Sequence, residues 1–96
     1  MGAEEFFVKS AGKNARDAFN TAVEDAQYEY GHGGYTGTIA EKHGFVMVTV
    51  PSGHNIEDYA YKLVDEGAHQ VSDKWGPAGC IDLDNGSYMF FGLASS

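Results

Sequence analysis

The residues whose types could support chemistry lie in two short segments, 31–35 and 52–55. The first reads Gly-His-Gly-Gly-Tyr and the second Ser-Gly-His-Asn, so each places a histidine beside glycine. Glycine backbone, imidazole rings and the free N–H groups at a helix start can together bind an anionic small molecule. The candidate ligand-binding residues are therefore His32, Gly33, Tyr35, Ser52, His54 and Asn55. The alternative is that the glycines only meet the needs of backbone geometry.

No established catalytic or metal-binding motif accompanies these histidines. Their spacing matches neither H-x-x-x-H nor H-E-x-x-H, and a single cysteine cannot supply a zinc finger. The glycine run follows a predicted helix, whereas a dinucleotide-binding loop or a P-loop follows a strand. We favour a non-enzymatic protein and name no catalytic residue, no metal and no cofactor. Cys80 is expected to be a small buried strand residue.

The charge of the chain restricts its partners. Fourteen acidic and six basic residues give a net charge of −8, which repels phosphate backbones and argues against direct nucleic-acid binding. The outward acids of two predicted helices have two interpretations. They form a solvated layer, or they present carboxylates where a nucleic-acid-binding protein expects phosphates. The candidate partner-binding residues are Asp17, Glu24, Asp25, Glu57, Asp65, Glu66 and Trp75.

Two helices should position these residues. From about Asn14 to Tyr30 the apolar residues recur at i, i+3, i+4 and i+7, which is typical of an amphipathic helix that ends at the following glycines. Asn55 is a predicted N-cap, with acids in the turn that follows, and the apolar stripe beyond it predicts a second helix that ends at Gly67.

Five strands are predicted, at 5–9, 36–41, 45–50, 80–83 and 87–93. Two turns predict hairpins, Lys-His-Gly at 42–44 and Asp-Asn-Gly at 84–86. Segment 68–79 is expected to be an ordered loop, in which Trp75 anchors the chain against the core.

These elements predict one α+β domain over residues 1–96. The order favours a two-layer sandwich, a ferredoxin-like βαββαβ arrangement with an extra C-terminal strand. Right-handed crossovers would place both helices on one face of a mainly antiparallel sheet. The end of the first helix would then meet the start of the second, which would bring His32 close to His54.

The second face of this sheet would also be apolar. Three strands are apolar at successive positions, at 6–8, 45–48 and 89–91, so neither face is polar. Two helices on one face leave the other uncovered. Either the Trp75 loop and the last strand cover it, or a homodimer or another partner binds there.

Three segments together resemble a group of small uncharacterised proteins of phages, prophages and their bacterial hosts. These are G-H-G-G-Y-T-G-T-I-A-E-K at 31–42, D-K-W-G-P-A-G at 73–79 and A-F-x-x-A-V-x-x-A at 18–26. The resemblance implies no activity and no catalytic residue. It implies a small accessory protein of mobile elements, a class that often acts by binding host proteins. The motif residues that are either structural or functional are Tyr35, Thr36, Thr38, Glu41, Asp73, Lys74 and Trp75.

Three functional hypotheses follow. The leading one is a small acidic non-enzymatic binding protein, a phage-derived inhibitor of a host protein complex that acts in anti-defence, for example as an anti-CRISPR or a nucleic-acid mimic. The alternative is a binding protein or enzyme for a small anionic ligand, such as a nucleotide or sugar phosphate, at 31–35 and 52–55. The third is an oligomeric building block. The single cysteine, the lack of a signal peptide and the lack of a long apolar run predict a cytoplasmic protein without a membrane segment.

Overall fold

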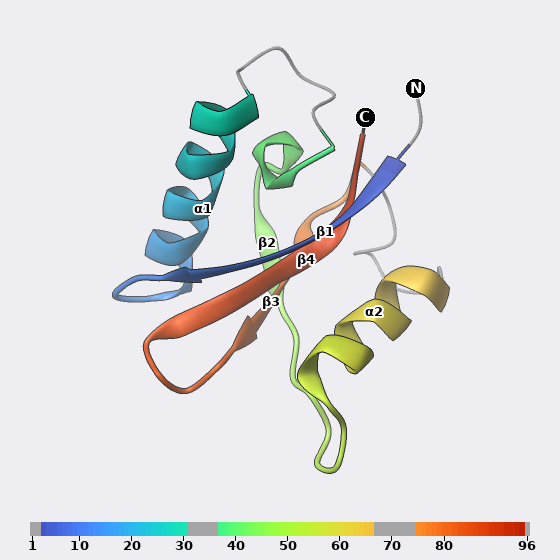
Figure 1. The fold of residues 1–96 in the computed structure, drawn as a ribbon. Helices are drawn as coiled ribbons and strands as arrows, with labels where there is room; N and C mark the ends of the chain where they lie inside the picture. Colours follow the sequence, from blue (N-terminus) through green and yellow to red (C-terminus); the bar gives the residue numbers. More distant parts are fainter. Residues whose placement is uncertain (1–2, 31–36, 67–74, 96) are drawn as a thin grey trace.

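The computed structural model describes residues 3–30, 37–66 and 75–95 of the chain (Figure 1). It is an α+β fold in which two helices pack on a mixed sheet. The elements are β1 (Ala3–Ala11), α1 (Ala15–Tyr30), the 3-10 helix η1 (Ile39–Glu41), β2 (Phe45–Met47), α2 (Ile56–Glu66), β3 (Ala78–Asp82) and β4 (Ser87–Ser95).

The four described strands lie in the order β1-β4-β3-β2, so β1 and β2 are the edges of the sheet. β4 pairs antiparallel with both β1 and β3, whereas β2 and β3 are parallel. The predicted Asp-Asn-Gly hairpin is confirmed between β3 and β4, because Asp84 and Gly86 adopt positive φ angles of 62° and 82°. Leu83 N closes the turn by donating to Ser87 O at 3.1 Å.

Both helices begin at an asparagine cap, of which the one at Asn55 was predicted. The Oδ1 atom of Asn14 accepts from Asp17 N at 2.9 Å, and the Oδ1 atom of Asn55 accepts from Asp58 N at 3.2 Å. Each amide oxygen satisfies a backbone donor that the first helical turn leaves without a partner. The polar caps therefore fix where each apolar stripe begins.

The strand predicted over 36–41 is wrong for the part of it that the structure describes. Ile39–Glu41 forms the 3-10 helix η1, started by the hydroxyl of Thr38, which accepts from Ala40 N at 3.2 Å. Lys42 N donates to Ile39 O at 2.9 Å and completes the turn. A local side-chain cap therefore prevailed over the β-branched composition of this segment. The described residues consequently do not show the ferredoxin-like βαββαβ order or its central hairpin.

The prediction that both helices lie on one sheet face is wrong as well. Neighbouring residues of a strand point to opposite faces, and the two cores separate by this alternation. Phe6 and Phe90 pack with residues of α1, whereas Phe7 and Phe91 belong to the cluster that contains Ala60 of α2. The sheet lies between the two helices (Figure 1). Because the strands are apolar at successive positions, each face needs a cover, and each helix provides one.

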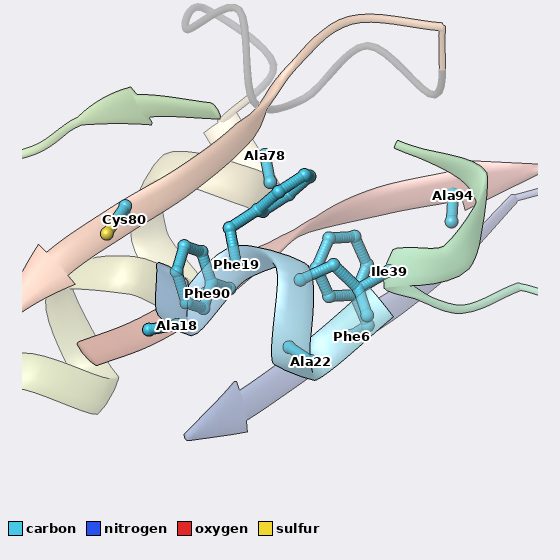
Figure 2. Close-up of a cluster of buried hydrophobic side chains, with 9 residues drawn as sticks. All are labelled: Phe6, Ala18, Phe19, Ala22, Ile39, Ala78, Cys80, Phe90 and Ala94. Atoms are coloured by element: carbon cyan, nitrogen blue, oxygen red, sulfur yellow. The ribbon is translucent and has the colours of Figure 1, made fainter. Parts of the chain in front are cut away.

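The cluster under α1 is rich in aromatic rings (Figure 2). The ring of Phe19 lies 5.2 Å from that of Phe45 and 5.5 Å from that of Phe90. The guanidinium of Arg16 lies 5.2 Å from the centroid of Phe45, within range of a cation–π interaction. Phe90 is fully buried at the centre of this cluster.

The cluster under α2 covers the second sheet face. Val64, Ile81 and Phe91 are buried there, and half-buried apolar residues surround them. At its margin the ring of Tyr61 stacks on Phe7 at 4.9 Å. Since α2 covers this face, the reason for expecting a homodimer through it no longer holds, and the oligomeric state stays a prediction.

Candidate functional site

The two halves of the predicted ligand site differ in how far the structure describes them. His32, Gly33 and Tyr35 lie outside the described residues. Ser52, His54 and Asn55 are exposed in the loop before α2. Figure 1 places the end of α1 and the start of α2 at opposite ends of the view, so these helix ends do not meet as the ferredoxin-like arrangement predicted.

The loop before α2 borders a hollow of about 460 Å³ that also includes Asp82 and Asp84. The imidazole of His54 stacks edge to face on Tyr59, with ring centroids 5.5 Å apart. Asn55 already serves as the helix cap. The carboxylates of Asp82 and Asp84 would repel an anion in this hollow, and the acids of the first α2 turn already use the positive helix end. The geometry of this hollow therefore argues against the anionic ligand that the sequence predicted here.

The predicted acidic surface is divided in two. Asp17, Glu24 and Asp25 are exposed on α1, whereas Glu57 and Asp65 are exposed on α2, across the sheet. The expectation of one continuous surface is therefore wrong, because it depended on both helices sharing a face. The individual residues also differ in role.

Some of these acids already have structural partners. The Oδ2 atom of Asp17 accepts from Lys13 N at 3.1 Å, at the start of α1. Glu57 pairs with Lys9 of β1 at 3.4 Å, which connects α2 to the edge strand. Glu66 ends α2, and its side chain lies outside the described residues. Glu24 and Asp25 remain the clearest candidates for contact with another molecule.

Trp75 does not anchor its segment in the core. Its side chain is 67% exposed, so the expected role as a buried anchor is wrong. A hydrogen bond connects this segment to the rest of the chain instead. The side chain of the buried Lys42 donates from Nζ to Gly76 O at 2.9 Å. This bond connects the segment 31–42 with the segment 73–79, which gives the lysine of the first motif a structural role.

Sequence reasoning missed a groove beside β1, which has a volume of about 490 Å³ and which we call the β1 groove. Its walls are residues 4–10 of β1, residues 37–39 and one stripe of α1. That stripe follows helical spacing and consists of Ala22, Asp25, Ala26 and Glu29. No pattern along the sequence marks β1 as an edge strand, so the groove could not be found before the strand order was known.

Carboxylates dominate the α1 side of the β1 groove. Asp25 and Glu29 are exposed on the helix, and Glu4 is exposed on the strand. The Glu4 side chain lies against Gly37, since a Cβ on Gly37 would be 2.7 Å from Glu4 Oε2. Lys9 is the lysine in the groove lining, and its ammonium pairs with Glu57 on the other sheet face. The wall formed with α1 therefore carries negative charge.

Among the described residues, no group of three His, Cys, Asp or Glu side chains could hold a metal ion. Cys80 is fully buried in β3, as predicted, and this burial, with a smaller effect of Asp82, raises the pKa of the thiol to about 12. It is therefore protonated at neutral pH and is no nucleophile. On the α2 face, the charge of Glu5, which also accepts the hydroxyl of Tyr61, raises the pKa of Tyr61.

Comparisons of the chain with protein-family models, curated proteins and solved structures found no match. The resemblance to phage and prophage proteins therefore stays a prediction. In the described part of the chain, no helix is long and apolar enough to cross a membrane.

Proposed function

We propose that this chain is a small acidic protein that acts by binding another protein and not by catalysis. The observation that carries the proposal is the exposed carboxylate surface of α1, formed by Glu24, Asp25 and Glu29. In a chain of net charge −8, such a surface would attract a basic partner and accelerate its association. The same charge opposes direct binding of nucleic acid.

The class of partner follows from charge and from the resemblance. A protein that binds nucleic acid offers a basic groove, and carboxylates on a helix can occupy the places of phosphates there. We therefore propose a cytoplasmic inhibitor of a host defence or nucleic-acid-processing complex, encoded by a phage or prophage. An anti-CRISPR protein and a nucleic-acid mimic are the two forms that this proposal takes.

The test is capture of partners from a bacterial host lysate on the immobilised protein, at low salt and at 0.5 M salt. A specific partner should be retained at low salt and weakened at high salt, because screening shortens the reach of surface charge. The matched variants are Glu24→Gln/Glu29→Gln on α1 and Glu57→Gln/Asp65→Asn on α2, which remove equal charge. The α1 variant should lose the partner and the α2 variant should keep it. Recovery of no partner at either salt concentration would refute the proposal.

The rival function, binding of a small anionic ligand near Ser52 and His54, is the weaker proposal because Asp82 and Asp84 share that hollow. A thermal-shift screen with nucleotides and sugar phosphates tests it. A ligand at 100 times its dissociation constant should add about 2.7 kcal/mol to the free energy of unfolding. The absence of any shift would refute this rival function.

A further inference from the structure

The open edge of β1 offers unpaired backbone groups beside the β1 groove. Beyond the end of the strand, Gly12 N donates to Gly86 O at 3.3 Å, which continues the register between β1 and β4. In an antiparallel pair, hydrogen-bonded and non-bonded residue pairs alternate. The backbone N–H and C=O groups of Glu5, Phe7 and Lys9 therefore point away from β4 and toward the open edge. No other strand in the described ranges pairs with this edge.

Small side chains on α1 leave room for a further strand at this edge. Ala22 and Ala26 line the groove, and their methyl groups project little from the helix. An edge strand with unpaired backbone groups is a ready template for an added strand. Affinity in such strand addition comes from main-chain hydrogen bonds, and selectivity comes from the side-chain surroundings.

The charge of the groove selects the occupant. Glu4, Asp25 and Glu29 line its α1 side, so an incoming strand would place alternate side chains beside three carboxylates. A second copy of this chain carries the same net charge of −8, which opposes edge-to-edge pairing of two copies. The complementary occupant is an extended segment that carries lysine or arginine.

We propose that the β1 groove binds an extended, lysine- or arginine-containing segment of a partner protein, which adds to the sheet as a strand beside β1. This inference rests on the proposed function, because it assigns the site and the chemistry of the bound partner. Main-chain bonds to Glu5, Phe7 and Lys9 hold the segment, and the carboxylates of Asp25 and Glu29 receive its basic side chains.

A synthetic nine-residue peptide of alternating lysine and valine, with blocked ends and a fluorescent label, is the probe. Binding to the full chain is measured by fluorescence anisotropy, and the same peptide with glutamate in place of lysine is the control. The lysine peptide should bind and the glutamate peptide should not. No binding of the lysine peptide would overturn the proposal.

Two double variants distinguish binding in the groove from a general effect of net charge. Asp25→Asn/Glu29→Gln removes two carboxylates inside the groove, and Asp58→Asn/Asp65→Asn removes two exposed carboxylates of α2, outside the groove. The first should raise the dissociation constant about five- to tenfold, as expected for two surface ion pairs, and the second should change it little. Equal weakening by both would overturn the proposal, since only net charge would then matter.

Two substitutions of Lys9 test whether backbone hydrogen bonds at the β1 edge hold the peptide. Both Lys9→Pro and Lys9→Ala lose the ion pair with Glu57, so they differ in the backbone N–H. Lys9→Pro removes an outward N–H without removing a bond to β4, whereas Lys9→Ala keeps that N–H. Thermal melting checks that both variants fold. Lys9→Pro should abolish binding and Lys9→Ala should preserve it. Equal binding by the two variants would contradict strand addition.

Amide hydrogen exchange provides a readout that does not depend on substitution. The amide of Phe7 should exchange faster than that of Val8 in the free protein and should become protected when the peptide binds. An unchanged Phe7 exchange rate at saturating peptide would place the peptide elsewhere and would overturn the proposal. If the chain forms dimers that Lys9→Pro dissociates in light scattering, the occupant is a second copy, which also overturns it.

The lysate experiment distinguishes failure of the β1 groove as the binding site from failure of the proposed function. A specific partner that Lys9→Pro and Asp25→Asn/Glu29→Gln still capture would leave the proposed function standing and would overturn the groove as its site. Capture of no partner by the wild-type protein would refute the proposed function itself.

Discussion

The two faces of the sheet differ in the buried apolar packing that lies under their helices. Under α1, the rings of Phe19 and Phe90 meet in an enclosed aromatic cluster, and Phe90 is fully buried. Under α2, half-buried aliphatic residues surround a smaller buried centre, and Tyr61 stacks on Phe7 while remaining 53% exposed. The α1 face therefore contributes more of the packing that fixes the fold, and the α2 face is closer to solvent.

This difference also bears on the proposed binding site. One side of α1 packs on the aromatic cluster, and a neighbouring stripe lines the β1 groove. A helix held firmly by its core presents Asp25 and Glu29 in fixed positions, which lowers the entropic cost of binding. The better packed face is thus also the face that positions the proposed site.

The largest effect is expected from emptying the aromatic cluster. Phe90→Ala should lower the free energy of unfolding by about 3–5 kcal/mol, because a fully buried ring is lost and a cavity remains. Urea denaturation measures the change. Tyr28→Ala is the control, since Tyr28 is 93% exposed and its loss should change stability by less than about 0.5 kcal/mol. Similar losses for the two variants would contradict the difference in burial.

The α2 face is tested by crowding it. A Cβ on Gly79 would lie 2.4 Å from Cζ of the buried Phe91, so Gly79→Ala should cost about 1–3 kcal/mol. Gly44→Ala is the matched control, because nothing lies within 4 Å of a Cβ there. Chemical denaturation of both variants gives the comparison. If Gly79→Ala is as stable as Gly44→Ala, the close packing of Phe91 on β3 is wrong.

Loss of the asparagine cap should lower stability by a similar amount at the two helix starts, whereas the two sheet faces should differ. Asn14→Ala and Asn55→Ala each remove a cap and should each cost about 1 kcal/mol. Asn20→Ala, at an exposed position inside α1, should be neutral or slightly stabilising, since alanine is the better helix former. Thermal unfolding monitored by circular dichroism measures all three. A cap substitution without any loss would show that its helix start is held by packing instead.

The smallest effect is expected for the ion pair between β1 and α2. Lys9 and Glu57 lie 3.4 Å apart, and their side chains are 61% and 57% exposed. Glu57→Gln should therefore cost less than about 1 kcal/mol at low salt and still less at 0.5 M salt. Denaturation at the two salt concentrations provides the check. A loss above about 2 kcal/mol would mean that this pair holds α2 on the sheet.

Much of the local structure could be predicted from the sequence. The helical stripe of α1, the cap at Asn55 and the hairpin with Asp84 and Gly86 follow rules that depend only on nearby residues. The burial of Cys80 in a strand was predicted as well. These features agree with the structure because their interactions span only a few positions of the chain.

The candidate site was predicted far less well. Asp17, Glu24, Glu57 and Asp65 were identified as charged helix positions, but their division between two faces depends on which side of the sheet each helix packs. The exposure of Trp75 depends equally on its tertiary surroundings. Burial and proximity of distant segments are decided by packing, which local patterns do not contain.

The sequence by itself determined an acidic α+β domain with two amphipathic helices, an asparagine cap on the second of them, strands that are apolar on both faces, and a buried thiol. Only the tertiary structure decided that the helices cover opposite faces, that Ile39–Glu41 turns as a 3-10 helix, and that β1 is an edge strand of the sheet formed by the described residues. The physical reason is that propensity and capping act within a few residues. Strand order and helix placement depend on contacts between distant residues, such as Phe90 with Phe19 and Lys42 with Gly76.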